Sequence, residues 1–441
     1  MKKSALNHAL SLCKKEGWEV IKRENPTREE ETYIVKAFGY DFPAAHPYQI
    51  HLTLYRKSTS PDQKFFHMRA AHDYLWPEFG YSWNDWDERR FRAHCEGYKY
   101  IVMAGGSGVA KSHSAARIAC LWWLSDPKNN ACIIASTTLE ALESRIWGYA
   151  AKFMDEAVLP LPIKVLKGKP PKIMRKDARE KIHGMFAVAV RQGDTDAVTS
   201  SLIGRHPNKG LMIVLDEATD MNARVVEALP NLEKGIDFFQ CWAIGNSSSH
   251  SDLHGALATP KLGWEKIEPK KDFIWETTYD KGVCLYFNPY DSPAIKEKDP
   301  SRRAILSSFL PTLESLEKDR EIRGSDSEAF WRFVMGFWKS RDLETTIASK
   351  AFVTESQVHK GAEWTGFYPL DMVAGLDPAF QVGGTGCLLR LAILGHTTDR
   401  DKICLDYRQE ELLFRIQINV TDTKSGELQI AENVVRILRE F

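Results

Sequence analysis

The segment YIVMAGGSGVAKS, residues 100–112, constrains the fold of this 441-residue chain more than any other. An apolar stretch, Tyr100 to Ala104, leads into a glycine-rich turn that ends in Lys111-Ser112, and the helical pattern SHSAARIACLWWL follows. Strand, glycine-rich turn and helix in this order are the context of a phosphate-binding (Walker A) loop. Backbone N–H groups of such a turn point inward and the next helix adds its positive end, so the pattern predicts a triphosphate site.

The predicted loop has one departure from the usual pattern GxxxxGK[ST]. Its members are Gly105, Gly106, Ser107, Gly108, Val109, Ala110, Lys111 and Ser112. Lys111 would reach the β and γ phosphates, and the Ser112 hydroxyl would bind Mg²⁺. Ala110 stands where the pattern has glycine, and alanine is tolerated at negative φ but strained at positive φ. The alternative is a strand-to-helix turn with an incidental lysine.

A second motif, LMIVLDEA at residues 211–218, is an apolar stretch that ends in two adjacent carboxylates. Parallel strands place ligand groups at their carboxyl ends, so this segment is typical of a Walker B strand. Asp216 would hold the Mg²⁺ shell, and Glu217 would orient and deprotonate the attacking water. The alternative is a helix cap with an acid in the first turn. Two charges on a buried strand are costly without a cation, which favours the metal-binding interpretation.

Apolar runs alternate with helical patterns through the middle of the chain, at residues 131–135, 186–190, 211–215 and 239–244. Short apolar runs separated by helices predict an α/β fold with buried parallel strands. The length predicts two or three domains. We expect an N-terminal extension of unassigned role at 1–75, an ATPase domain at 76–300 and a charged helical linker or lid at 301–365. A second sheet would follow at 366–441, with strands at 372–377, 387–395 and 402–406.

Amino-acid composition says more about the cellular compartment of the chain than about its binding partner. Lys plus Arg and Asp plus Glu number 59 each, so net charge neither requires nor excludes a polyanion. The eight cysteines show no CxxC pair and no zinc-like spacing, which indicates a reduced cytosol. The sequence has no signal peptide pattern and no run of about 18 apolar residues, so we expect no membrane partner.

Three further segments allow two interpretations each. The strand CIIAS, followed by Thr137-Thr138, would touch a nucleic-acid track or relay the nucleotide state, or Thr138 would cap the next helix. Asn246-Ser247, after the strand at 239–245, would lie near the γ-phosphate or form an ordinary polar loop. Residues 164–181 carry eight basic residues against two acids, and would contact DNA phosphates or form a solvated loop.

In this order the motifs resemble one family, the large terminase subunit of tailed bacteriophages. The resemblance spans about residues 76–410 and rests on GGSGVAKS, IIASTT, LMIVLDEA, AIGNSSS, EAFWRFVMGFWKS and VAGLDPA. It implies a RecA-like P-loop NTPase of the additional-strand, conserved-glutamate (ASCE) type, a helical linker and the start of an RNase H-like nuclease domain. Lys111, Ser112, Asp216 and Glu217 then form the ATPase core, Asn246 and Ser247 the coupling element, and Asp377 the first metal-binding carboxylate of the nuclease.

The resemblance also implies cofactors and partners. ATP and Mg²⁺ serve the motor, and Mg²⁺ or Mn²⁺ serves the nuclease. A homo-oligomeric ring, a pentamer, would act in the host cytoplasm at the portal vertex of the procapsid and be absent from the mature virion. Its partners would be double-stranded DNA, the portal protein and the small terminase subunit.

Ring motors also use an arginine that reaches a neighbouring subunit's nucleotide. The candidates are Arg145 and Arg205, each of which could equally be a surface ion-pair partner. Two-metal nuclease chemistry needs several carboxylates, and Asp377 alone cannot supply them. Asp406 is better read as a surface acid than as a second ligand, so we expect the nuclease domain to be incomplete in this chain. The alternatives for the whole are a helicase-like P-loop translocase, or a nucleotide-responsive DNA-binding subunit that does not hydrolyse ATP.

Overall fold

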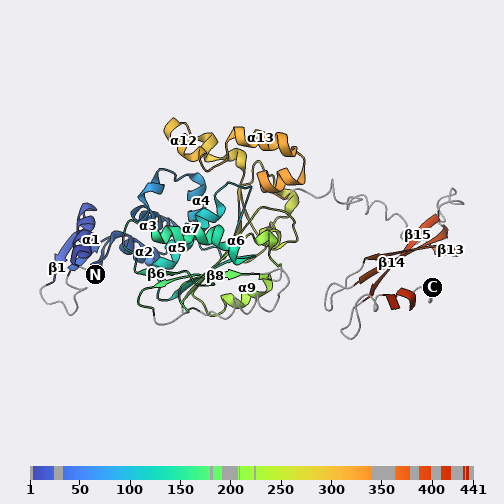
Figure 1. Cartoon of the computed structure of the whole chain (residues 1–441), viewed down its shortest axis with the longest axis horizontal. Helices are drawn as coiled ribbons and strands as arrows, with labels where there is room; N and C mark the ends of the chain where they lie inside the picture. Colours follow the sequence, from blue (N-terminus) through green and yellow to red (C-terminus); the bar gives the residue numbers. More distant parts are fainter. Residues whose placement is uncertain are drawn as a thin grey trace. The chain divides into compact units, whose positions relative to one another are not determined.

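The structure is a computed structural model of the chain (Figure 1). It describes residues 3–23, 33–178, 182–190, 207, 209–222, 225–338, 363–377, 387–398, 409–418, 431–432 and 434–436. The chain divides into two compact units, residues 1–339 and 340–441. Among the described residues, no helix has the length and apolar character needed to span a bilayer.

A nine-stranded sheet forms the centre of the first unit. Its order is β11 (Ile274–Glu276), β12 (Gly282–Phe287), β4 (Tyr100–Gly105), β10 (Phe238–Gly245), β9 (Gly210–Asp216), β5 (Asn130–Ser136), β8 (Met185–Ala189), β7 (Lys172–Arg175) and β6 (Ile163–Leu166). The six strands from β12 to β8 are parallel, and the strands at the two edges are antiparallel. The predicted strands at 131–135, 186–190, 211–215 and 239–244 are all found.

The position of β10 is the most informative feature of this sheet. It pairs with β4 on one side and with β9 on the other, so one additional strand separates the strand of the glycine-rich loop from the strand of the acid pair. This arrangement is an α/β P-loop NTPase fold, and it confirms the predicted fold class for the first unit.

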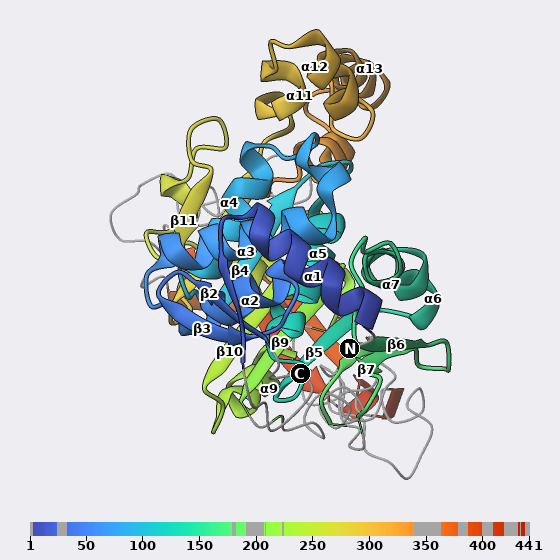
Figure 2. The ribbon, with the colours of Figure 1, turned by 90° about the vertical axis from the view of Figure 1, so that its left-hand side faces the viewer.

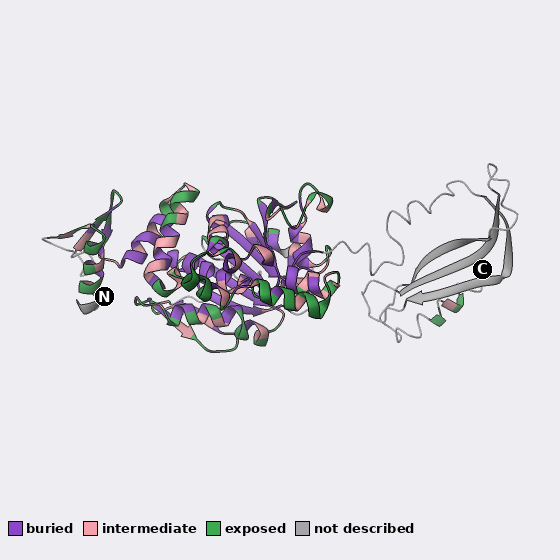
Figure 3. Cartoon of the chain, turned by 90° about the horizontal axis from the view of Figure 1, so that it is seen from above, coloured by how far each residue is buried: buried purple, intermediate pink, exposed green. Residues whose placement is uncertain are grey.

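Helices cover both faces of the sheet. They are α2 (Pro47–Lys57), α3 (Pro61–Leu75), α4 (Asp85–Cys95), α5 (Lys111–Ser125), α6 (Leu139–Ser144), α7 (Ile146–Asp155), α9 (Val225–Glu233) and α10 (Leu253–Ala258). Alternate residues of β4 belong to different core clusters: Ile101 and Met103 pack with α2 to α5 and α7, whereas Val102 and Ala104 pack with α9 and α10. Burial on both faces explains why the strands are continuous apolar runs (Figure 3).

The N-terminal residues form a small sheet of their own. Helix α1 (Lys3–Lys15) packs with the antiparallel strands β1 (Glu19–Lys22), β2 (Tyr33–Ala37) and β3 (Tyr40–Pro43) around a separate apolar cluster. Helices α2 and α3, which the sequence analysis placed in the N-terminal extension, contribute instead to the core beneath the main sheet. The Tyr48 hydroxyl donates to the Pro160 carbonyl at 3.1 Å. The ATPase core therefore includes residues from before position 76.

The segment expected to be a charged helical linker is helical up to residue 335. It contains α13 (Leu313–Arg323), the π-helix η6 (Phe330–Met335) and all but the first residue of α12 (Pro300–Ser307), and α11 (Pro293–Lys296) precedes it. Figure 2 shows α11, α12 and α13 together at one end of the first unit. Short 3₁₀ turns occur at η2 (Pro77–Gly80), η3 (Ala218–Asp220), η4 (Trp264–Lys266) and η5 (Pro289–Asp291).

The second unit contains three antiparallel strands in the order β13 (Glu363–Asp377), β14 (Cys387–Thr398) and β15 (Gln409–Ile418). Asp377 is the last residue of β13 and pairs in register with Leu388. The strand expected at 402–406, with Asp406, lies outside the described residues. Three antiparallel strands occur in many folds, so the RNase H-like assignment stays a prediction.

Candidate nucleotide site

The glycine-rich loop joins β4 to α5, as predicted. Lys111 is the first residue of α5, and its side chain folds back over the loop. Its Nζ donates to the carbonyls of Gly105 at 2.5 Å and Gly106 at 2.8 Å, and to Asn246 Oδ1 at 3.0 Å. Burial, together with the nearby Arg90, lowers the pKa of Lys111 to about 7. An anion at this position would favour the charged form of the lysine.

Ala110 adopts the backbone conformation in which alanine is strained. Its φ is +58° and its ψ is 30°, in the left-handed region. Gly108, two residues earlier, also has a positive φ, +81°. The usual glycine at position 110 would adopt this conformation without strain. The loop therefore keeps the left-handed geometry in spite of the substitution.

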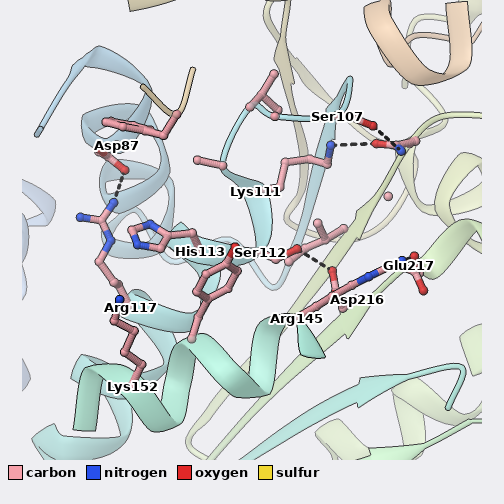
Figure 4. Close-up of a pocket in the computed structure, with 18 of the residues that line it drawn as sticks. Asp87, Ser107, Lys111, Ser112, His113, Arg117, Arg145, Lys152, Asp216 and Glu217 are labelled. Atoms are coloured by element: carbon pink, nitrogen blue, oxygen red, sulfur yellow. Dashed lines mark hydrogen bonds and ion pairs between the residues drawn. The ribbon is translucent and has the colours of Figure 1, made fainter. Parts of the chain in front are cut away.

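Ser112 and Asp216 meet at the carboxyl ends of β4 and β9. The Ser112 hydroxyl donates to Asp216 Oδ1 at 2.8 Å, and Figure 4 shows the two side chains pointing toward each other. Asp216 Oδ2 is buried and has no hydrogen-bond partner among the described residues. Burial raises the pKa of this carboxyl group, mainly because the charged form is desolvated.

An unpartnered buried carboxylate oxygen beside a hydroxyl fits a bound cation. Among the described residues there is no group of three or more His, Cys, Asp or Glu side chains that could hold a metal ion. This result does not oppose Mg²⁺, because Mg²⁺ in nucleotide sites takes one or two protein ligands and completes its shell with phosphates and water. The residues present therefore fit magnesium.

Glu217 follows Asp216 directly and turns out of the strand. Its φ is +60° and its ψ is 42°, so it too adopts the left-handed conformation. Strained backbone of this kind in a non-glycine residue clusters at functional sites. The Glu217 carboxylate forms an ion pair with Arg145, which lies between α6 and α7 (Figure 4). The arginine that we considered for contact with a neighbouring subunit thus contacts an acid of its own chain.

The predicted coupling residues face two different neighbours. Asn246 accepts from Lys111, and its Nδ2 donates to Ser107 Oγ at 3.3 Å. Ser247 is buried, and its hydroxyl donates to the Gly336 carbonyl at 2.9 Å. The polar end of β10 therefore connects the glycine-rich loop with the segment that follows α13.

A cavity of about 1260 Å³ joins these groups. At the loop end it is lined by Lys111, Ser112, Asp216, Glu217 and Asn246. Phe79, Asn84, His113 and Tyr149 also line it, and the centroid of the His113 ring lies 5.7 Å from that of Phe79 and 5.2 Å from that of Tyr149. These aromatic residues were not predicted as part of the site, although aromatic residues are dense between 76 and 86.

Buried charged side chains on α4 and α5 contact the loop and the start of α5, and none of them was predicted from the sequence. The Arg90 guanidinium donates to the Val109 carbonyl at 2.5 Å and to Ser114 Oγ at 3.0 Å. Asp87 accepts from Ser114 at 2.9 Å and from Arg117 at 2.5 Å. Because Arg90 contacts the loop carbonyl directly, α4 fixes the position of the loop.

Two of the segments left open can now be placed. The Thr138 hydroxyl accepts from the Ala141 N–H at 3.0 Å, so Thr138 caps α6. The basic stretch is not a plain loop: β6 and β7 form a hairpin at the sheet edge, because Ile163 and Ile173 are buried toward the core. Arg205 lies outside the described residues.

The fold and the loop together define the first unit as a P-loop NTPase domain. No protein-family model matches the sequence, and no curated protein matches it either. Large terminases of phages are among the solved structures to which the chain is similar, which agrees with the resemblance predicted from the motifs.

The structure of the HK97 bacteriophage large terminase is 12% identical, with a TM-score of 0.43, over 76% of this chain and 63% of that one. The chain thus spans less than two thirds of the length of the HK97 protein. The large terminase of a thermophilic bacteriophage, in complex with ADP, is 10% identical, with a TM-score of 0.35, over 89% of this chain and 74% of that one. A variant of the ATPase domain of the large terminase of Thermus phage P74-26 is 14% identical, with a TM-score of 0.39, over 59% and 96%. The chain's own strand order and loop geometry, and not these scores, carry the fold assignment.

Proposed function

We propose that the chain is the large terminase subunit of a tailed bacteriophage, an ATP-hydrolysing motor that moves double-stranded DNA into a procapsid. One observation carries the ATPase part: Lys111, Ser112, Asp216 and Glu217 line one cavity at the carboxyl ends of β4 and β9. Ligands of open α/β sheets bind at such ends. The order of the motifs along the chain supports the packaging role over a helicase. A helicase would need a second RecA-like motor domain after residue 300, and the sequence there shows a helical segment followed by VAGLDPA.

In this proposal the phosphates lie over residues 105–112. Loop N–H groups and the start of α5 hold the β-phosphate, and Lys111 turns its ammonium group from the loop carbonyls to the phosphates. Ser112 and Asp216 would hold Mg²⁺, which when bound neutralises charge on the phosphate oxygens. The aromatic side chains that line the cavity, Phe79, His113 and Tyr149, are suited to the adenine ring.

Glu217 is the proposed general base. Its carboxylate would orient the attacking water and accept its proton, and Arg145 holds that carboxylate at the cavity. Arg145 and Arg205 also stay candidates for the cation that reaches a neighbour's γ-phosphate. Asn246 and Ser247 would couple loss of that phosphate to movement.

The second unit would contribute Asp377 as the first metal-binding carboxylate of a nuclease that uses Mg²⁺ or Mn²⁺, although Asp377 alone cannot supply two-metal chemistry. The proposed partners are the DNA, the portal protein and the small terminase subunit, and the proposed assembly is a pentameric ring in the host cytoplasm. One observation favours a second function: the strained Ala110 would suit a DNA-binding subunit that binds ATP without turnover.

DNA-stimulated ATP hydrolysis by the full chain tests the motor. We expect turnover in the wild type, loss of turnover with retained ATP binding in Glu217→Gln, and wild-type turnover in Glu140→Gln, which changes an exposed acid on α6. Binding without turnover in the wild type would favour the second function. Equal turnover in Glu217→Gln and the wild type would refute the proposed base.

Plasmid cleavage with Mg²⁺ or Mn²⁺ tests the nuclease. Because Asp377 alone cannot supply the several carboxylates that two-metal chemistry needs, we expect no cleavage by this chain. Cleavage by the wild-type chain that Asp377→Ala abolishes, and that Asp371→Ala on the same strand preserves, would contradict this expectation.

A further inference from the structure

Residues 330–338, which we call the strap, pack directly on the glycine-rich loop. The Ser107 N–H donates to the Phe333 carbonyl at 2.7 Å. A Cβ on Gly106 would lie 1.9 Å from the Val334 carbonyl oxygen, and a Cβ on Gly336 would lie 1.8 Å from the carbonyl carbon of Gly105. Both positions must be glycine because the two backbones touch.

The strap is also fixed on its other sides. The Met335 carbonyl accepts a hydrogen bond from the Tyr286 hydroxyl at 3.1 Å, and the Gly336 carbonyl accepts one from the Ser247 hydroxyl at 2.9 Å. Trp338 stacks on His254 with the ring centroids 5.1 Å apart. The backbone at residue 332 is therefore held at a defined place beside the loop.

From that place the Arg332 side chain lines the same cavity as Ser107, Lys111 and Glu217. Its Nη2 donates to Asp220 Oδ1 at 3.2 Å, and this pair is partly open to solvent, with the side chains 30% and 51% exposed. Its Nε is buried and has no hydrogen-bond partner among the described residues. A partly exposed ion pair of this kind is weak, and the Nε–H of Arg332 is available to donate a further hydrogen bond.

Three other cations that line the cavity have shorter contacts, and Lys152, which also lines it, forms an exposed ion pair with Glu156 at 3.7 Å. Lys111 is bonded to the loop, Arg145 to Glu217 and Arg117 to Asp87. A triphosphate remains negative after one divalent ion and one lysine are counted, so a further cation would stabilise it. Arg332 meets this need with a guanidinium, which binds phosphate oxygens through two donors at once.

We propose that Arg332 is a phosphate-binding residue of its own chain, which exchanges Asp220 for the terminal phosphate of ATP. The strap then senses whether that phosphate is present, because its backbone is fixed to the loop while its side chain reaches the ligand. This inference rests on the proposed function, since it requires ATP in the cavity.

Equilibrium binding of ADP and ATPγS to the full-length chain tests the proposal. We expect Arg332→Gln to weaken ATPγS binding by about 10- to 100-fold, as for a lost hydrogen bond to a charged group, and to leave ADP binding within about twofold. Arg332→Lys should recover part of the ATPγS affinity. Arg320→Gln, the same change on an exposed arginine of α13, should alter neither.

Loss of ADP and ATPγS affinity by the same factor in Arg332→Gln would mean that Arg332 only supports the structure, and no loss would also overturn the proposal. A wild-type chain that binds neither nucleotide would refute the proposed function instead. The variant Asp220→Asn adds a second test, because it removes the carboxylate that forms an ion pair with Arg332. It should strengthen ATPγS binding more in the wild-type background than in Arg332→Gln, and equal effects in both backgrounds would contradict the exchange.

Discussion

Replacing Ala110 by glycine should stabilise the first unit, although it removes a methyl group. At a φ of +58° the Cβ of Ala110 crowds the following carbonyl, which costs about 1–2 kcal/mol relative to glycine. Two terms oppose the gain. The more flexible unfolded chain of the variant costs about 0.4–1 kcal/mol. The methyl group is only partly buried, so its loss costs about 0.4 kcal/mol, half of the value for a buried CH₂ group. The net stabilisation is about 0.5 kcal/mol.

The reverse substitution in the same loop is the matched control. Gly108 has a φ of +81°, and no atom of the described chain lies within 4 Å of a Cβ added there. Gly108→Ala therefore introduces the same backbone strain without a steric clash, and should destabilise the unit by about 0.5–1 kcal/mol. Gly168→Ala, where the space is also open and φ is not positive, should not show this loss.

Calorimetric unfolding measures the difference. For a unit of 339 residues the unfolding entropy is about 0.7 kcal/mol/K, so the two loop variants should differ by about 2 °C in Tm, with Ala110→Gly the higher. Unfolding of Ala110→Gly below the wild-type temperature, with Gly108→Ala unfolding at the wild-type temperature, would refute the proposed strain at Ala110.

Three other variants test the loop and the buried side chains of α4. Gly106→Ala should lower stability by about 2 kcal/mol and weaken ATPγS binding at least about tenfold, because the Val334 carbonyl lies 1.9 Å from the new Cβ; unchanged affinity in a binding titration would contradict the strap contact. Arg90→Met should cost about 3 kcal/mol in chemical unfolding, since it leaves the Val109 carbonyl and Asp87 short of a buried partner, and a loss below about 1 kcal/mol would contradict this. Burial lowers the pKa of His94 to about 4, so the unfolded chain binds more protons between pH 4 and 6.5 and stability falls as the pH drops through that range. His94→Gln should lose about 3 kcal/mol less than the wild type between pH 7 and 4, and parallel pH profiles would contradict the assignment.

The parts of the site that sequence reasoning found are local in the chain. The loop at 105–112 and the acid pair at 216–217 each follow an apolar strand within a few residues, so a short window contains the whole pattern. Because parallel strands end at the same edge of a sheet, Ser112 and Asp216 could be expected near each other. Their 2.8 Å hydrogen bond agrees with that expectation.

The parts that it missed depend on contacts between distant segments. Phe333 bonds to Ser107 across 226 positions through a backbone carbonyl, which carries no residue-type signal. Arg90 and Val109 lie 19 positions apart, on different elements. For Arg145 the sequence left two roles open, contact with a neighbouring subunit or an ion pair, and the partner Glu217 lies 72 positions away on a different element.

The contact between Gly106 and Gly336 has a consequence for how this protein can vary. Where two main chains touch, no side chain can move to accommodate a shift of the backbone. The contact therefore depends on the path of the chain after α13. An insertion or deletion of even one residue between α13 and the strap would rotate Gly336 away from its partner. The spacing of that surface segment should therefore be as restricted as the loop itself.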